Sequence, residues 1–352
     1  MSSEPGANGR PPNTAEILRE VTGIAAEPGT LAERAEALLA QVERVVPFEA
    51  SFIAVLRPGE GAHVAMGRHG YGDRVEGYMD GTSMLEDIEL LGLTRSRRLM
   101  QNSDSPVPMA EIPGWAEYLE PAGFRDSFAV GLFTPDGRYL GVLGMHTASE
   151  PPVNEANLGL IELIAPQVAV AVDPLCSLAT IAGLVQRAAA GIVLAPSGAV
   201  LSLPGLPQHR LLTPGSGVLA AAAAQLAGDG PYASFVAPLP DAEGAEAGET
   251  HVRVTVLAAP SDLRPFAAAV VLLSPAPDLH GLSRRELQVL GWLVTGASNE
   301  RIALGLSITA RTVEVHVGHL LAKLAASSRT AAAARALRLG LFVPSSLLGV
   351  RS

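Results

Sequence analysis

Lysine is almost absent from this chain of 352 residues, in which Lys323 is the only one. A phosphate-binding loop needs a lysine to reach the nucleotide phosphates, and a phospho-accepting receiver domain uses one beside its aspartate. The sequence therefore excludes a fused ATPase of that type and a standard receiver domain.

Cysteine is equally scarce, since Cys176 is the only one. A single cysteine can form neither an internal disulfide nor a cysteine-clustered metal site. We expect Cys176 to pack as a small buried or interfacial apolar side chain rather than to act as a redox switch.

Long apolar runs are also missing, because no stretch approaches the roughly 18 residues that a membrane-spanning helix needs. Residues 1–12 are rich in Pro, Gly and Ser and lack an apolar core, which predicts a disordered leader rather than a signal peptide. With 48% hydrophobic, 4% aromatic and 17% charged residues, the composition predicts a globular protein packed by Ala, Leu and Val. We expect a cytoplasmic protein of two or three domains, with no membrane contact.

Common catalytic motifs are absent from the sequence: there is no Gly-x-Ser-x-Gly elbow, no His-Glu-x-x-His and no carboxylate pair with supporting context. His63 and His69 could ligate a haem, but strand histidines without a partner pattern are usually structural. We therefore expect no enzyme, no metal site, no catalytic residue and no cofactor.

Residues 281–324 show three short amphipathic helices in succession. Ser283 and Glu286 form a capping box that opens the first helix, Gly296 supplies its left-handed stop, and Ser298 caps the second. The small residues Ala303 and Gly305 predict a close crossing of the second and third helices. The third helix presents an apolar inward face made of Val313, His316, Val317, Leu320 and Leu324. This pattern is typical of a helix-turn-helix.

The motifs Leu282-Ser283-x-Arg285-Glu286-x-x-Val289-Leu290, Gly296-x-Ser298-Asn299-x-x-Ile302-Ala303 and Thr312-Val313-x-Val315-His316 resemble the DNA-binding domain of LuxR-type transcriptional regulators. The resemblance implies an all-α four-helix domain over 276–352 whose third helix enters the major groove of double-stranded DNA. It also implies a homodimer contact through the last helix, where Ala331 to Ala334 form a smooth surface. The implied DNA-binding residues are Ser298, Asn299, Arg301, Arg311, Thr312, Glu314, Val315, Gly318, His319 and Lys323.

Two groove-facing positions depart from the family pattern, because Glu314 and Gly318 stand where basic residues are common. Glu314 either accepts a hydrogen bond from a cytosine amino group or is a solvated carboxylate that DNA repels. Val315 can contact a thymine methyl group, whereas Arg311 and Lys323 are better placed for phosphates.

Charge agrees with a DNA-binding role. Residues 279–352 contain nine basic and three acidic residues, a net charge of +6, so the remainder of this −10 chain carries −16. Neutralised phosphates supply most non-specific DNA affinity, and an acidic body repels DNA from every other surface.

Residues 13–173 predict an antiparallel sheet with helices on one side. The order is two helices, two strands, an irregular insert over 70–124, two strands joined by the turn Thr134-Pro135-Asp136-Gly137, and a long helix opened by Asn154.

This order, and the run from Gly123-Phe124 through Asp136-Gly137-Arg138-Tyr139 to Gly144, is similar to GAF domains. GAF domains are small-molecule receptors or dimerising modules, so the resemblance implies a small-molecule effector as a candidate partner. The implied ligand-lining residues are Tyr78, Met84, Met100 and Trp115. A bilin held through a cysteine is excluded inside this domain, because Cys176 lies beyond it.

Residues 174–275 predict a hairpin, an alanine-rich helix over 217–226, an acidic loop over 241–249, and strands over 251–258 and 266–274. The pattern faintly resembles PAS domains, and its few polar residues favour a spacer or dimerising role. The expected fold class is therefore α+β and multidomain: a GAF-like sheet with helices, a PAS-like centre, and a helical DNA-binding end.

The leading hypothesis is a transcription factor in which the GAF-like domain controls the helix-turn-helix, with RNA polymerase as a candidate partner. The alternative is a regulator that acts through protein–protein contacts after losing sequence-specific DNA binding, as Glu314 and Gly318 would allow.

Overall fold

The computed structural model describes residues 14–148, 155–226, 230–239 and 250–348. The chain divides into two compact units, residues 1–174 and 175–352, which are described separately. The predicted leader over 1–12, the Asn154 cap and the acidic loop over 241–249 lie outside the described residues.

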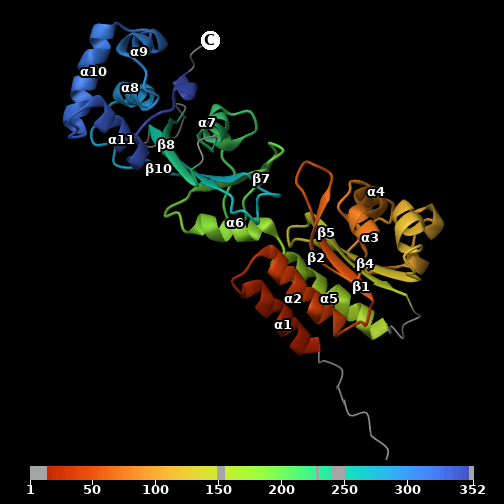
Figure 1. Cartoon of the computed structure of the whole chain (residues 1–352). Helices are drawn as coiled ribbons and strands as arrows, with labels where there is room; N and C mark the ends of the chain where they lie inside the picture. The colour runs from red at the N-terminus through yellow and green to blue at the C-terminus, as the bar shows by residue number, and fades with distance from the viewer. Residues whose placement is uncertain (1–13, 149–154, 227–229, 240–249, 349–352) are drawn as a thin grey trace, which may run out of the picture. The chain divides into compact units, whose positions relative to one another are not determined.

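The first unit is built on a five-stranded antiparallel sheet with the order β2-β1-β5-β4-β3 (Figure 1). The four long strands were expected from the sequence, whereas β3 is too short to give a periodic signal. Gly137 (φ 89°) closes the predicted turn between β4 and β5. The strands are β1 (Ala50–Leu56), β2 (His63–His69), β3 (Met100–Gln101), β4 (Asp126–Phe133) and β5 (Tyr139–Thr147).

Helices cover both faces of this sheet (Figure 1), so the expectation of helices on one side is wrong. Helices α1 (Thr14–Ala26), α2 (Leu31–Glu43) and α5 (Glu155–Ala171) lie on one face. The insert covers the other with α3 (Asp73–Met79), α4 (Ser83–Leu90) and the π-helical turn η3 (Trp115–Leu119). The reason lies in β1: Ala50, Phe52 and Ala54 join the core of the insert, while Ile53 and Val55 are buried on the alternate face.

The second unit contains another five-stranded antiparallel sheet, with the order β7-β6-β10-β9-β8. The helix α7 (Gly217–Leu226), whose bounds were predicted, packs on it, whereas α6 (Pro174–Gly183) and β8 were not predicted. Its strands are β6 (Ala190–Leu194), β7 (Val200–Ser202), β8 (Tyr232–Pro238), β9 (His251–Ala258) and β10 (Ala269–Pro275).

Four helices complete the second unit and confirm the helix-turn-helix prediction: α8 (Arg284–Val294), α9 (Asn299–Leu306), α10 (Ala310–Lys323) and α11 (Arg329–Leu339). The capping box of Ser283 and Glu286 is present, Gly296 has φ 75°, and Ser298 Oγ accepts a hydrogen bond from Arg301 N (3.3 Å). Local sequence therefore determines where each helix starts and ends.

Gly305 has a different packing role from the one expected. A Cβ at this position would lie 2.4 Å from Cζ2 of Trp292, so the glycine makes room for the indole of α8 rather than for α10. The alanines of α11 also differ from expectation, because Ala332 and Ala336 are fully buried. The smooth surface predicted from Ala331 to Ala334 is therefore partly used inside the domain.

The helix-turn-helix shares one hydrophobic core with the second sheet, rather than hanging from it on a linker. After α11 the chain returns along β8, where Val236 N donates to Phe342 O (3.0 Å) and Val343 N donates to Leu287 O of α8 (3.3 Å). Phe342 is 2% exposed and lies beside Phe235. We call residues 341–343 the docking segment, because they join the sheet to α8.

In the part of the chain that the structure describes, no single helix has both the length and the apolar character needed to cross a membrane; only α5 and α6 taken as a pair meet those two criteria.

Truncating the docking segment should destabilise the second unit. Phe342→Ala removes a fully buried ring, and such changes cost about 3–5 kcal/mol of unfolding free energy. Leu304→Ala is the matched control, because Leu304 is 84% exposed on α9 and its truncation should cost about 0.5 kcal/mol or less. Urea unfolding followed by Trp292 fluorescence, in a Trp115→Phe background, gives both values. Equal losses would show that the docking segment adds no stability.

Candidate functional site

The exposed face of α10 is the candidate nucleic-acid interface. Arg311, Glu314, Val315, Gly318 and His319 follow the helical spacing of one face, and all five are exposed. Val313 and Leu320 on the opposite face are fully buried. His316 and Val317, which were expected to point inward, are only half-buried. The helix therefore presents a continuous strip of side chains to solvent.

Arg311 and Glu314 interact with each other on this strip. Arg311 Nη1 lies 3.3 Å from Glu314 Oε2, and the two side chains are 84% and 64% exposed. An exposed pair of this kind contributes little stability, so either partner can be exchanged for a DNA group at low cost. The carboxylate also offsets part of the positive charge that Arg311 would offer to a phosphate.

The start of α9 adds a second group of candidate contacts. Arg301 is exposed, and no hydrogen bond or ion pair of its guanidinium is present among the described residues. Ser298 is exposed, its Oγ caps the helix and its hydroxyl also hydrogen-bonds to Glu300, while Asn299 is half-buried. Leu304, one turn after Arg301, is a large apolar side chain in solvent that the sequence analysis did not single out.

Thr312 has a partner at the start of α10. Its backbone N donates to Thr309 Oγ1 (3.1 Å), and the two hydroxyls lie 2.8 Å apart. The predicted contact residue therefore also fixes the cap of the helix that carries the strip.

A buried carboxylate connects α8 to the far end of α10. Glu286, whose side chain is 3% exposed, accepts hydrogen bonds from Lys323 Nζ (2.8 Å) and Ser283 N (2.7 Å), and His319 Nδ1 lies 3.8 Å away. Lys323 Nζ also donates to Gly281 O (2.8 Å). Burial raises the pKa of Glu286, but the hydrogen bonds from Lys323 and Ser283 outweigh it and hold that pKa below its usual value.

This cluster gives Lys323 a structural role that sequence analysis missed. Other cations are used in the same way: Arg285 Nη2 donates to Leu306 O (2.6 Å), and Arg329 Nη2 donates to Ala297 O (2.5 Å). The sequence analysis counted all basic residues of this region together. In the structure, however, Lys323, Arg285 and Arg329 hydrogen-bond to other segments of the domain. The positive charge on the α9–α10 surface therefore comes mainly from Arg301 and Arg311.

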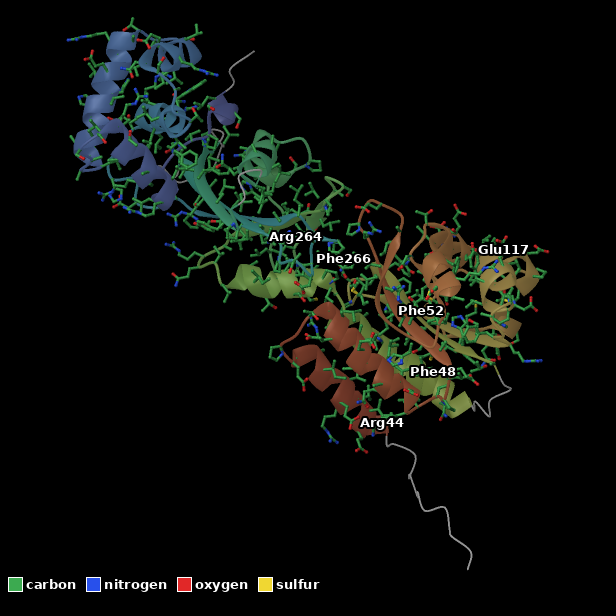
Figure 2. The ribbon with its side chains drawn as sticks, in the orientation of Figure 1. Arg44, Phe48, Phe52, Glu117, Arg264 and Phe266 are labelled. Atoms are coloured by element: carbon green, nitrogen blue, oxygen red, sulfur yellow. The ribbon has the colours of Figure 1, made fainter. Side chains whose placement is uncertain are left out.

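A small cavity lies in the first unit between the sheet and the insert. It has a volume of about 60 Å³, and Tyr78, Met84 and Trp115 line it, together with Phe52, which Figure 2 labels on β1. Met100, the fourth predicted ligand-lining residue, is buried but does not line the cavity. A volume of about 60 Å³ holds about two water molecules, whereas ligand pockets are typically several hundred Å³.

Two polar groups that the sequence analysis did not identify border this cavity. Asp87 is buried and accepts hydrogen bonds from Tyr78 Oη (2.6 Å) and Gly114 N (2.8 Å). Gly114 is required for this approach, because a Cβ there would lie 2.2 Å from Tyr78 Oη. The sequence signal that could have identified Asp87 is an aspartate at an inward-facing position of helix α4.

His146 is the other polar group. Its Nδ1 lies 2.7 Å from Tyr71 Oη, and its ring stacks on Phe52 with a centroid distance of 6.1 Å. Burial lowers the pKa of His146 to about 3, so the imidazole is neutral near pH 7. The cavity thus combines an apolar lining with a neutral imidazole and a satisfied carboxylate.

His63 and His69, which the sequence analysis considered as haem ligands, each lie close to a polar side chain of the protein. His63 Nε2 lies 3.1 Å from Tyr139 Oη, and His69 Nε2 lies 3.3 Å from Glu36. Cys176 is half-buried on α6. Among the described residues, no three His, Cys, Asp or Glu side chains gather as a metal site would require.

Comparison with known families identifies two domains in the chain. Residues 280–336 match the model of bacterial regulatory proteins of the luxR family, and residues 30–172 match the GAF domain model. The chain carries a GAF domain and a LuxR-family domain.

Its relatives share the LuxR-family domain. The uncharacterized transcriptional regulatory protein YhcZ of Bacillus subtilis is 47% identical over 62 residues, which are 18% of this chain and 29% of that protein. The nitrate/nitrite response regulator protein NarP of Escherichia coli is 51% identical over 51 residues, 14% of this chain and 24% of that protein. The chain thus spans less than a third of the length of these curated relatives.

Among solved structures, a phycoerythrobilin-bound GAF domain from a cyanobacterial phytochrome is similar at 18% identity and a TM-score of 0.35. The match covers 46% of this chain and 94% of that one.

Removing the ammonium beside Glu286 should destabilise the LuxR-family domain. Breaking a buried pair costs about 3–5 kcal/mol, but Lys323 is 37% exposed, so we expect Lys323→Met to cost about 1–3 kcal/mol at pH 7. Because the folded pKa of Glu286 is lowered, this stabilisation is complete above pH 4.5 and is lost as the pH falls further. Urea unfolding from pH 7 to pH 3.5 measures the difference. Arg338→Met, which removes an exposed cation from α11, is the control and should cost much less.

His146 should make the GAF domain less stable in acid. Its folded pKa of about 3 is below the ordinary 6.5, so stability is complete above 6.5 and falls as the pH decreases between these values. The slope for one histidine is at most about 1.4 kcal/mol per pH unit. His146→Gln should reduce the measured slope, leaving the share of His63, whose pKa burial lowers to about 4.

Urea unfolding of His146→Gln between pH 7 and pH 4.5, followed by Trp115 fluorescence in a Trp292→Phe background, measures that slope. His69→Gln is the control, because His69 is 67% exposed. An unchanged slope in His146→Gln would contradict the assignment.

Proposed function

We propose that this chain is a DNA-binding transcriptional regulator in which the GAF domain controls the LuxR-family domain. The observation that carries the proposal is the exposed strip of α10, flanked by Arg301, on a helix-turn-helix whose opposite face is fully packed. The basic net charge of residues 279–352 supports it, because phosphate neutralisation drives DNA association.

In this proposal α10 lies in the major groove. Arg301 and Arg311 bind phosphates, with Ser298, Asn299 and Thr312 as polar contacts near the helix starts. Val315 and His319 face base edges, and Gly318 lets the helix approach them closely. Lys323 remains a proposed phosphate contact through the part of its side chain that stays exposed, in addition to holding Glu286.

We further propose a homodimer, because one recognition helix beside two exposed cations, of which Arg311 is paired with Glu314, gives modest affinity and paired half-sites increase it. With Ala332 and Ala336 buried, the contact on α11 would involve the exposed Ala334, Leu337 and Arg338. RNA polymerase is a further proposed partner, and the cytoplasm is the proposed location.

The GAF cavity is the proposed effector site. At about 60 Å³ it admits only a very small molecule unless the insert moves. An effector would therefore favour a more open state of the insert and shift the balance between two conformations. Apart from the hydrogen-bonded carboxylate of Asp87, its lining is uncharged, which favours an uncharged, largely apolar effector that exchanges one hydrogen bond with His146.

The proposed domains are 13–173 (GAF), 174–275 (PAS-like) and 276–352 (LuxR-type). The PAS-like assignment is supported by strand order, since the second sheet follows the same 2-1-5-4-3 pattern as the GAF sheet. In the proposal this central domain transmits the signal, because the docking segment joins its strand β8 to α8. Regulation through protein–protein contacts alone is the less supported alternative, since Arg301 and Arg311 are exposed on one surface.

The test is DNA binding by the full chain, since the helix-turn-helix shares a core with the central sheet. Binding to duplexes selected from genomic DNA should weaken steeply with added salt. Arg301→Ala and Arg311→Ala should weaken binding on all sequences, while Val315→Ala should change sequence preference. Arg264→Ala, which removes an exposed arginine outside both the groove contacts and the proposed dimer contact, is the control. Failure to bind any duplex in dilute buffer would refute the proposal.

Glu314→Gln decides the role of the carboxylate within the same assay. If Glu314 accepts from a cytosine, the variant should lose about 1–3 kcal/mol of preference at one base pair. If the carboxylate is only repelled, the variant should bind every sequence more tightly, because Arg311 loses its competing partner.

A further inference from the structure

A second small cavity lies inside the second unit, where the start of β9 meets the start of α8. Its volume is about 90 Å³, and three polar side chains, His251, Arg284 and Gln288, line it together with Val343 and Leu347. This volume corresponds to about three water molecules, the size range of a phosphate or a short carboxylate. The site belongs to neither the α10 strip nor the GAF cavity.

His251 presents an unsatisfied polar atom in this cavity. The residue is 3% exposed, its Nδ1 lies 2.9 Å from Thr250 Oγ1, and its Nε2 has no hydrogen-bond partner among the described residues. Burial, and then the nearby Arg284 guanidinium, lower the pKa of His251, so the ring is neutral at pH 7. When the Thr250 hydroxyl donates to Nδ1, the single ring proton is on Nε2. In that tautomer Nε2–H is a buried donor without an acceptor, which is costly, so this tautomer calls for an acceptor in the cavity.

The other two polar groups are also donors. Gln288 Oε1 already accepts from Arg285 Nη1 (2.9 Å), which leaves the amide NH₂ as the free end of that side chain. The Arg284 guanidinium has no hydrogen bond or ion pair within the described part of the chain. Arg284 is also the first residue of α8, where the helix dipole favours negative charge. No carboxylate is among the residues that line the cavity, so a cation has no ligand there.

We propose that this cavity binds a small oxyanion, held by Arg284, the amide of Gln288 and Nε2–H of His251. The shared chemistry is that of inorganic phosphate or a short carboxylate. Such an ion joins β9 to α8 and therefore strengthens the same sheet-to-helix junction that the docking segment forms. Because the ion binds only the folded junction, it stabilises the second unit by mass action.

The test uses the full chain with inorganic phosphate as the probe and chloride at equal ionic strength as the reference. Phosphate should shift the His251 Nε2 resonance in a saturable manner and raise the thermal midpoint of the second unit. A parallel titration with acetate shows whether the cavity prefers a short carboxylate or phosphate.

Arg284→Gln should weaken phosphate affinity at least tenfold while leaving the midpoint in chloride almost unchanged, because this side chain is exposed. Arg338→Gln is the matched control and should keep wild-type affinity. Gln288→Met, which removes the amide at similar length, provides a second variant should Arg284→Gln fail to fold, and it should also weaken binding.

The proposal is overturned if phosphate leaves the His251 resonance unmoved, or if Arg284→Gln and Arg338→Gln bind phosphate equally. It is also overturned if Arg301→Gln, rather than Arg284→Gln, abolishes phosphate binding, because the ion would then lie on the α9–α10 surface. That last result would leave the proposed DNA contacts intact, so the two proposals fail separately.

Discussion

The ion pair between Glu286 and Lys323 sets the geometry on which the LuxR-family domain depends. The carboxylate is buried at the start of α8, so it needs a charged partner, and the ammonium that satisfies it comes from the last turn of α10. The same carboxylate completes the cap of α8 through Ser283 N. One side chain therefore caps the start of α8 and holds the last turn of α10 beside it. The direction of α10 determines which side chains its exposed strip can present together.

The second constraint is that the LuxR-family domain and the central sheet share one core. A helix-turn-helix on a flexible linker would respond to its neighbours only through proximity. Here Phe342 and Val343 hydrogen-bond to strand β8 and helix α8, respectively, so displacement of either element must break contacts with the other. In the proposed function, these shared contacts are the route by which a change in the central sheet would reach α8.

Much of the fold could be predicted from the sequence, because its signals are local. Capping residues such as Ser283, Ser298 and Thr30 mark helix starts, and the Asp136-Gly137 turn marks a hairpin. What could not be predicted depends on contacts between distant segments. The pairing of Glu286 with Lys323, the space that Gly305 leaves for Trp292, and the return of residues 341–343 along β8 have no local signature.

The candidate sites show the same contrast between what local sequence predicts and what depends on contacts between distant segments. The exposure of Arg311, Glu314 and Val315 followed from helical periodicity, whereas Arg285 and Arg329 were indistinguishable from surface cations until their carbonyl partners were known. In the GAF domain, the family resemblance pointed to Tyr78, Met84 and Trp115, which line the cavity, whereas the positions of Asp87 and His146 depend on folding of the insert over the sheet.

The scarcity of lysine acquires a practical meaning from the position of Lys323. Amine-directed chemistry, such as acetylation, reductive methylation or coupling to an activated surface, has a single side-chain amine to modify in this sequence. Acylation of that amine would leave the buried carboxylate of Glu286 without its counter-charge. Immobilising or labelling the protein by acylation of its lysine would therefore loosen the helix pair that carries the proposed DNA contacts.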